Sequence, residues 1–270
     1  MGNEIYSRTQ AERTEAVKIR KGVTVSHTAN LTYTFLLCAR HRRKIFHIYG
    51  IAELFHKKIH EAAEPNGFQI IEIIAKEEYA IIKVQASEKV TPNAIAIDMK
   101  RSVNLLIKTV VKLSGMERLC TRNYLVVSGD HIDDRVIKAF LDNQRKKNIR
   151  EHKVREIMDF ERQEHMVYHM VYSVKLEMRK KDRDKGWQGI DKYRLSDKLY
   201  QAYMGTTEKL RQIVYGEQGI ELILKSSPER KPYWIQMEAL NRVQTIIKEM
   251  TEQPPILKGC HIETKESVFW

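Results

Sequence analysis

The order in which strand-like and helix-like segments alternate constrains the fold of this chain more than any other feature. The apolar, β-rich run LTYTFLLCA (31–39) predicts a strand, and the apolar residues after it recur at helical spacing until Pro65 and Gly67. FQIIEIIA and YAIIKVQA predict two strands with a tight turn between them. A second helix is predicted between Pro92 and Gly115, and RNYLVVSG predicts another strand. The first half of the chain is therefore predicted to have the order β-α-β-β-α-β.

A similar order of segments starts again beyond residue 165. YTFLLCARHRRK (33–44) corresponds to YSVKLEMRKKDR (172–183), and Arg40 and Arg179 open the two basic clusters. MKRSVNLLIKTVVKL finds a counterpart in EALNRVQTIIKEM, and CTRNYLVVSG finds one in CHIETKESVFW. We interpret this agreement as an internal duplication.

The register of the second copy is set by a glycine and by a Tyr-x-Ile pattern. The stretch TEKLRQIVYGEQG is predicted to be a helix that ends at Gly219, as the corresponding helix of the first copy ends at Gly67. The strands that follow would carry Tyr79–Ile81 in the first copy and Tyr233–Ile235 in the second. The segment 184–204 would then be an insertion, and the second copy would lack a final long helix.

These segments predict four regions. Residues 1–29 would be a basic arm, 30–130 the first domain, 131–165 a highly charged linker region of one long helix or two, and 166–270 the second domain. The expected fold class is α+β, with two tandem ferredoxin-like antiparallel sheets of about four or five strands. Each sheet would carry its helices on one face, and the long helix would join the two.

The charge balance of the chain favours an anionic partner. Lys and Arg number 47 against 35 Asp and Glu, which gives a formal net charge of +12, and such a surplus attracts polyanions such as nucleic acid. The three cysteines have no CxxC spacing, which argues against a zinc ribbon or a disulfide framework and favours the cytoplasm. No apolar run approaches the roughly 20 residues that span a bilayer, so we expect no membrane association.

Residues 30–146 resemble the single-tyrosine HUH transposases of the smallest bacterial insertion sequences, the group that includes REP-associated tyrosine transposases. TYTFLLCARHRRKIF is similar to their opening strand and basic turn, and MKRSVNLLIK to one of their helices. NYLVVSGDHIDDRVIKAFLDNQ is similar to their closing strand and the helix that carries the nucleophile. The resemblance implies a dimer that cuts single-stranded DNA at hairpins, with two histidines holding a divalent metal and a tyrosine attacking phosphorus.

At the positions that carry this chemistry the sequence departs from the family. Tyr79 and Ile81 stand where the two histidines are expected, and Phe140 stands in place of the nucleophilic tyrosine. Gln144, which the resemblance places near the metal, is retained. An isoleucine cannot bind a metal and a phenyl ring has no oxygen to attack phosphorus. We therefore expect no catalytic residue, no metal, no cofactor and no enzymatic activity of this kind.

The clustered cations remain as candidates for contacts with nucleic acid. Guanidinium groups pair with phosphates through a fixed fork, clustered cations gain from counterion release, and neighbouring aromatic rings can stack on unpaired bases. The second copy's basic cluster is a candidate for the same reason. The candidate residues are Arg40, His41, Arg42, Arg43, Lys44, Lys100, Arg101, Lys108, Arg179, Lys180 and Lys181.

Together these features predict an inactive, transposase-derived protein that binds single-stranded or hairpin DNA, with a regulatory role. A tandem copy suggests a monomer in which one chain imitates the two-fold dimer of the family. Two alternatives stay open. The same sheet can bind RNA, since the fold alone does not choose the polymer, and the chain can instead be a protein–protein adaptor.

Overall fold

The computed structural model describes residues 26–110, 113, 115–145, 160–251 and 256–266. The predicted arm lies almost entirely outside these residues, as does the linker segment 146–159. The first half of the molecule contains β1 (Ser26–Ala39), α2 (Ile51–Ala63), β2 (Phe68–Ala75), β3 (Tyr79–Ala86), α3 (Pro92–Asn104), α4 (Leu106–Thr109), β4 (Cys120–Ser128) and α5 (Asp134–Arg145). The second half contains β5 (Glu161–Gln163), β6 (Met166–His169), β7 (Val171–Met178), α7 (Lys192–Tyr203), β8 (Lys209–Tyr215), β9 (Gly219–Lys225), α8 (Pro232–Thr251) and β10 (Leu257–Thr264).

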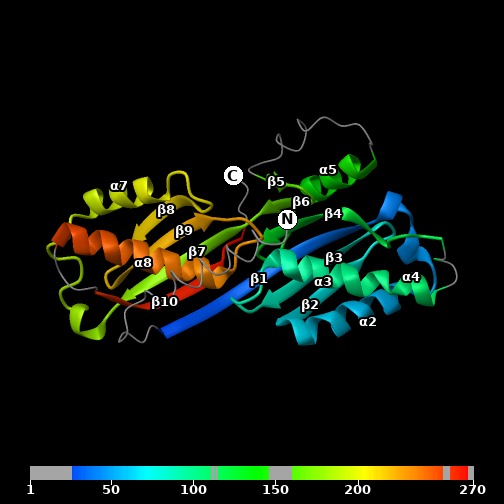
Figure 1. Cartoon of the computed structure of the whole chain (residues 1–270), viewed down its shortest axis with the longest axis horizontal. Coiled ribbons are helices and arrows are strands. Elements are labelled where there is room, and N and C mark those ends of the chain that lie inside the picture. The colour runs from blue at the N-terminus through cyan, green and yellow to red at the C-terminus, as the bar shows by residue number, and fades with distance from the viewer. Residues whose placement is uncertain (1–25, 111–112, 114, 146–159, 252–255, 267–270) are drawn as a thin grey trace, which may run out of the picture.

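All ten described strands form one elongated sheet, in which each half has a central strand (Figure 1). In the first half β1 lies between β3 and β4, and β2 pairs with β3 at the edge. In the second half β7 lies between β9 and β10, and β8 pairs with β9 at the edge. From the central strand onward both halves follow the order strand, helix, two strands, helix, strand, and the first half has α4 and α5 in addition.

The two halves are joined by parallel strand pairing. The segment Ser26–Asn30 of β1 runs parallel to Gly259–Glu263 of β10, and β6 runs parallel to Tyr124–Val127 of β4. The first half thus adds the beginning of β1 to the strands of the second half, and the second half adds β6 to the strands of the first. The prediction of two separate antiparallel sheets was wrong, because these pairings fuse them into one mixed sheet. The start of β1 also lies in the region predicted to be a loose arm.

Hydrogen bonds across the junction occur in matched pairs. The amide of Thr32 donates to Thr264 Oγ1 over 3.0 Å, and the amide of Val171 donates to Ser128 Oγ over 2.9 Å. At the starts of α3 and α8, the Asn93 amide donates to the carbonyl of Pro228, and the Tyr233 amide donates to the carbonyl of Glu88. In each pair, the two bonds run in opposite directions between the halves.

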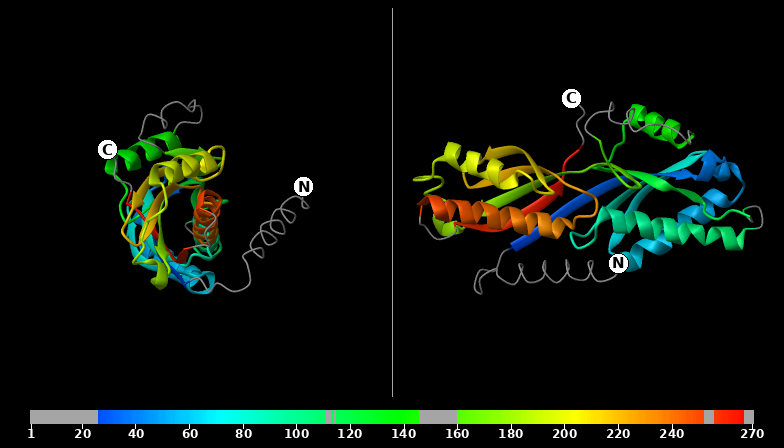
Figure 2. Two further views of the ribbon diagram at one scale, coloured as in Figure 1. Left: turned by 90° about the vertical axis from the view of Figure 1, so that its left-hand side faces the viewer. Right: turned by 45° about the horizontal axis from the view of Figure 1, so that its top comes forward.

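One face of the sheet carries α2, α3, α7 and α8 and forms a core that runs through both halves. Tyr33, Phe35 and Leu37 of β1 point into this core. Leu36 and Cys38 point to the opposite face, where α5 covers them in a second cluster. Because β1 is apolar on both faces, each face must be buried against other residues. Helix α5 buries the face opposite to the one that carries α3 (Figure 2). The long helix was predicted to join the two halves, whereas its described part, α5, packs against β1 and β4 of the first half.

The predicted register of the second half was also wrong. The stretch predicted to be its first helix is strand β8, and the segment predicted to be an insertion contains helix α7. Tyr233 and Ile235 lie in helix α8, which has Pro232 at its first position, and not on a strand. The short amphipathic stretch KLRQIVY fits helical and strand spacing equally, and its pairing with β9 makes it a strand. In the linker region, Glu161–Gln163 is a strand instead of part of a long helix.

None of the helices in the described ranges is long and apolar enough to cross a bilayer.

Candidate functional site

Helix α5 brings Phe140 to the sheet face where the family's chemistry would be expected. Phe140 is buried, with 3% of its surface exposed, among Leu36 and Cys38 of β1 and other apolar residues of β4 and α5. Tyr79 and Ile81 on β3 are half-buried and pack against the same cluster. The structure therefore brings together the three positions that differ from the family, and the place they share is apolar.

The side chains of this cluster offer little to a metal or a phosphate. Burial, and then the charge of Asp134, raise the pKa of Tyr79, so its phenol stays protonated near neutral pH. Gln144 Oε1 accepts a hydrogen bond from the side-chain nitrogen Nδ2 of Asn123 over 3.3 Å. Within the described ranges no three His, Cys, Asp or Glu side chains gather as a metal site would need. The absence of metal and of activity stays a prediction.

Arg42 fixes α5 against the sheet. Its Nε lies 2.5 Å from Glu78 Oε2, in the turn before β3. Its Nη1 donates to the carbonyl of Leu141 over 3.3 Å and lies 3.6 Å from Asp142 Oδ1, both on α5. The side chain is only 13% exposed, and its backbone adopts a left-handed φ of 51°. This candidate phosphate ligand is thus already engaged between the basic turn, β3 and α5.

The corresponding sheet face of the second half is open and charged. Tyr33 pairs with Val84 and Tyr172 with Leu224, so the places of Tyr79 and Ile81 correspond to Gly219 and Glu221. A pocket of about 420 Å³ opens there; its walls include Lys175, Glu177, Arg183, Gly219 and Glu221.

The charged groups on this open face pair with one another. Glu221 accepts from the Ser173 hydroxyl over 2.5 Å and lies 3.4 Å from Lys265. Lys175 lies 2.7 Å from Glu263. The sheet residues that α5 covers are apolar, because they are buried. The corresponding sheet residues of the second half, which no described helix covers, are charged.

The other candidates of the first half differ in how free they are. Arg40 lies 2.6 Å from Glu117, and Lys44 lies 2.6 Å from Glu77, whereas exposed Arg43 has no ion pair to any described residue. His41 has a left-handed φ of 60° and accepts from Arg40. These residues form the loop that follows β1, at one end of the molecule (Figure 1).

The three candidates on and after α3 lie on another part of the surface. Lys100 donates to the carbonyl of Arg122 and lies over the ring of Tyr124, and burial lowers its pKa. Arg101 is 75% exposed and lies 3.4 Å from Asp98. Lys108 is exposed. Only Arg101 and Lys108 are therefore well placed for a ligand in bulk solvent.

The candidates of the second half lie at the opposite end of the molecule, in the loop after β7 (Figure 1). Lys180 and Lys181 are exposed, and Arg179 lies 3.2 Å from Asp182. The amide of Arg40 donates to the Leu119 carbonyl and that of Arg179 to the Ile256 carbonyl, so the two arginines occupy matching places. The two basic loops themselves are separated by the length of the sheet.

Two residues near these loops were missed by the sequence reasoning. Tyr49 is 97% exposed and Tyr193 is 88% exposed, and each lies where a loop leads into a helix. Exposure depends on the tertiary packing, so only their nearness to basic clusters in the sequence could have pointed to them.

The chain was compared with solved structures, curated proteins and protein families. A crystal structure of a candidate transposase from Deinococcus radiodurans R1 is similar over 47% of this chain and 98% of that chain, with 14% identity and a TM-score of 0.38. A candidate monooxygenase from Lactobacillus acidophilus NCFM is similar over 87% of this chain and 92% of that chain, with 11% identity and a TM-score of 0.21. No curated protein matches the chain. The sequence profile described as "Transposase IS200 like" matches residues 27–144. This part of the chain is therefore similar to the IS200-like transposases.

Proposed function

We propose that this protein is a transposase-derived, non-catalytic binder of single-stranded or hairpin DNA, acting in the cytoplasm as a regulator. The observation that carries the proposal is the apolar cluster of Phe140, Tyr79 and Ile81 beneath α5. In an HUH enzyme this place would hold a metal, a phosphate and a phenolate, all of which need polar surroundings.

The repeated architecture supports an origin by tandem duplication. Both halves follow the same order around a central strand, and matched hydrogen bonds cross the junction in both directions. In a symmetric dimer each subunit makes the same contacts with its partner, and the two halves make such contacts within one chain. We therefore propose that the chain acts as a pseudo-dimer and is a monomer in solution.

The distribution of charge supports nucleic acid as the partner. The chain carries a formal net charge of +12, and exposed cations gather in the loops after β1 and β7. Binding through such loops would depend strongly on salt, because each phosphate contact releases counterions. The family is one of transposases, which supports DNA over RNA.

Two assays on the unmodified protein test the proposal. End-labelled hairpin DNA is incubated with the protein and Mg²⁺ or Mn²⁺, and a denaturing gel is run; we expect neither a nicked strand nor a covalent protein–DNA band. Affinity for the same DNA is measured at several salt concentrations, beside RNA of the same sequence. Removing the side chains of Arg43 and Lys44 should weaken binding and reduce the log–log salt slope by about 0.7 per lost contact on a single strand.

A matched control removes two equally exposed cations from the helices, Lys57 of α2 and Lys248 of α8. This variant has the same net charge as the Arg43 and Lys44 variant, so equal losses in the two would indicate attraction by the overall field alone. A covalent adduct would contradict the inactive part of the proposal. Stronger binding to RNA would favour the RNA alternative, and no binding to either polymer would favour a protein–protein adaptor.

A further inference from the structure

Tyr49 and Tyr193 are the most exposed of the large apolar side chains in the described ranges, at 97% and 88%. A single exposed tyrosine is ordinary on a protein surface. These two, however, lie in similar places, since each is near the junction between the loop that follows a central strand and the next helix. Tyr49 precedes the first residue of α2, and Tyr193 is the second residue of α7.

Buried aromatic residues hold both loops in place. In the first loop Phe46 is 8% exposed and its ring meets that of Phe55 edge to face, with centroids 4.9 Å apart. In the second loop Trp187 donates from Nε1 to the Gly216 carbonyl over 2.8 Å, and its ring meets that of Tyr215 at 5.2 Å. Each loop is therefore pre-organised, which lowers the entropy cost of binding a ligand there.

Each loop also carries exposed cations close in sequence to its tyrosine. Arg43 and Lys44 precede Tyr49, and the second loop has Lys180, Lys181 and Lys185 before Tyr193. The three lysines have no ion pair to any described residue. Lys44 is paired with Glu77 over 2.6 Å, whereas Arg43 has no ion pair to a described residue. An exposed ring near cations in the sequence is the combination that binds an unpaired base and its phosphates.

We propose that Tyr49 and Tyr193 each stack on an unpaired base of a nucleic acid strand whose backbone is held by the cations of the same loop. This inference rests on the proposed function and adds to it two contact points for unpaired nucleotides, in the loops after β1 and β7, which lie at opposite ends of the sheet (Figure 1). Stacking accepts any base, so these contacts would select unpaired over paired nucleotides and not one sequence over another. The two points lie at opposite ends, so one protein would bind two short strands.

The test uses the full chain, a short thymine oligonucleotide and a blunt-ended duplex of similar length. Affinity and stoichiometry are measured by titration for the unmodified protein, Tyr49→Ala, Tyr193→Ala and the double alanine variant. We expect two oligonucleotides per chain for the unmodified protein and one tight site in each single variant. The double variant should bind about 5- to 100-fold more weakly, the effect of losing a base–aromatic stack. Affinity for the duplex should stay unchanged.

Two controls separate stacking from other effects. Tyr49→Phe with Tyr193→Phe keeps the rings and should bind like the unmodified protein. Tyr200→Ala removes another exposed tyrosine, at 42%, from the far part of α7 and should also have no effect. Because all three tyrosines are exposed, thermal unfolding should change little in any variant.

The outcomes distinguish this inference from the function on which it rests. If the unmodified protein binds neither the oligonucleotide nor the duplex, the proposed function itself fails. If it binds the oligonucleotide and the double alanine variant binds equally well, the stacking role is overturned while nucleic-acid binding stands. An equal loss for the duplex would also overturn it, because a blunt duplex offers no unpaired base along its length.

Discussion

The phenolic oxygens of Tyr33 and Tyr172 lie 3.2 Å apart, and neither side chain has any exposed surface. The two residues occupy matching positions on the central strands: Tyr33 lies between Val84 and Ser128, and Tyr172 between Leu224 and Thr264. Their rings meet edge to face at 6.5 Å. The two central strands therefore contact each other through this pair of tyrosines.

Removing one hydroxyl of this pair should destabilise the whole molecule. In Tyr33→Phe or Tyr172→Phe the remaining hydroxyl is left buried without its partner, at a cost of about 1–3 kcal/mol in the free energy of unfolding. The double phenylalanine variant should lose less than the sum of the two single variants, because it leaves no orphaned group. Urea unfolding of the four proteins measures this. Additive losses would show that the two hydroxyls do not interact.

Replacing Arg42 by Ala should loosen α5 from the sheet. The guanidinium joins Glu78 to the carbonyl of Leu141, and its loss leaves these groups without that partner. Hydrogen exchange of the α5 amides should become faster, while exchange in α8 stays the same. The matched control is Arg43→Ala, because Arg43 is exposed and has no ion pair to a described residue. Equal exchange rates in both variants would contradict the role given to Arg42.

Restoring the family's nucleophile by itself should not restore cleavage. In Phe140→Tyr a hydroxyl enters an apolar cluster, and the phenol, with an ordinary pKa of about 10, stays protonated because no metal-binding histidine stands beside it. We expect no covalent adduct on a denaturing gel with hairpin DNA and Mg²⁺ or Mn²⁺. The variant with Tyr79→His and Ile81→His added is the informative comparison. Cleavage by Phe140→Tyr alone would show that the chemistry does not need those positions.

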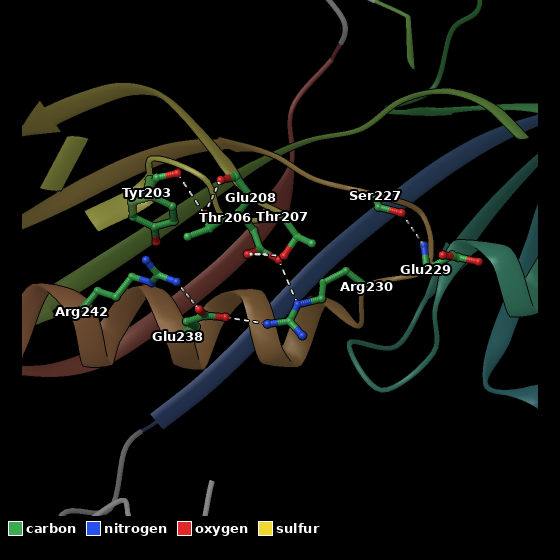
Figure 3. A network of polar contacts seen from close by, with 9 residues as sticks. All are labelled: Tyr203, Thr206, Thr207, Glu208, Ser227, Glu229, Arg230, Glu238 and Arg242. Atoms are coloured by element: carbon green, nitrogen blue, oxygen red, sulfur yellow. Dashed lines mark hydrogen bonds and ion pairs between the residues drawn. The ribbon is translucent and has the colours of Figure 1, made fainter. Parts of the chain in front are cut away.

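A buried ionic network holds the start of α8 to the loop before β8 (Figure 3). Arg230 Nε lies 2.9 Å from Glu208 Oε1, and its Nη2 lies 2.5 Å from Glu238 Oε2. Arg230→Ala should cost about 2–3 kcal/mol in urea unfolding, because Glu208 is 2% exposed and would keep a buried charge with fewer partners.

The first half offers a matched design for this network. The strand pairing shows that Phe68 occupies the place of Glu208. The starts of α3 and α8 show that Val90 occupies the place of Arg230. The double variant Glu208→Phe with Arg230→Val should therefore be more stable than Arg230→Ala, since an apolar pair leaves no unpaired charge. A double variant as unstable as Arg230→Ala would show that the two halves are packed differently there.

The same network should make the fold sensitive to acid. Burial by itself would raise the pKa of Glu238, but its hydrogen bonds and charge contacts with Arg242 and Arg230 outweigh burial and hold the pKa below its usual value. A carboxyl with a lowered folded pKa stabilises the fold fully above the unfolded value of about 4.5, and this contribution is lost as the pH falls through the folded pKa. Glu238→Gln should therefore unfold with a shallower pH dependence below about pH 4.5. An unchanged slope would contradict this assignment.

The sequence by itself determined the first half of the molecule and the nature of its altered site. The spacing of apolar residues, with Pro65, Gly67 and Pro92 marking helix ends, predicted β1 to β4 and the helices between them. Such a prediction works because local spacing decides which face of an element is apolar. The family resemblance pointed to Tyr79, Ile81 and Phe140, and the structure places them in one cluster.

Only the tertiary structure decided how the halves join and which residues are free to bind. Strand pairing is non-local, so neither the parallel junction of β1 with β10 nor the register of β9 could be obtained from short segments. The stretch KLRQIVY fits both periodicities until β9 pairs with it. Likewise Arg42 and Arg43 are neighbours of one residue type, yet packing against α5 occupies the first and leaves the second exposed. Exposure and partners depend on atoms far away in the sequence, and these are fixed only when the chain has folded.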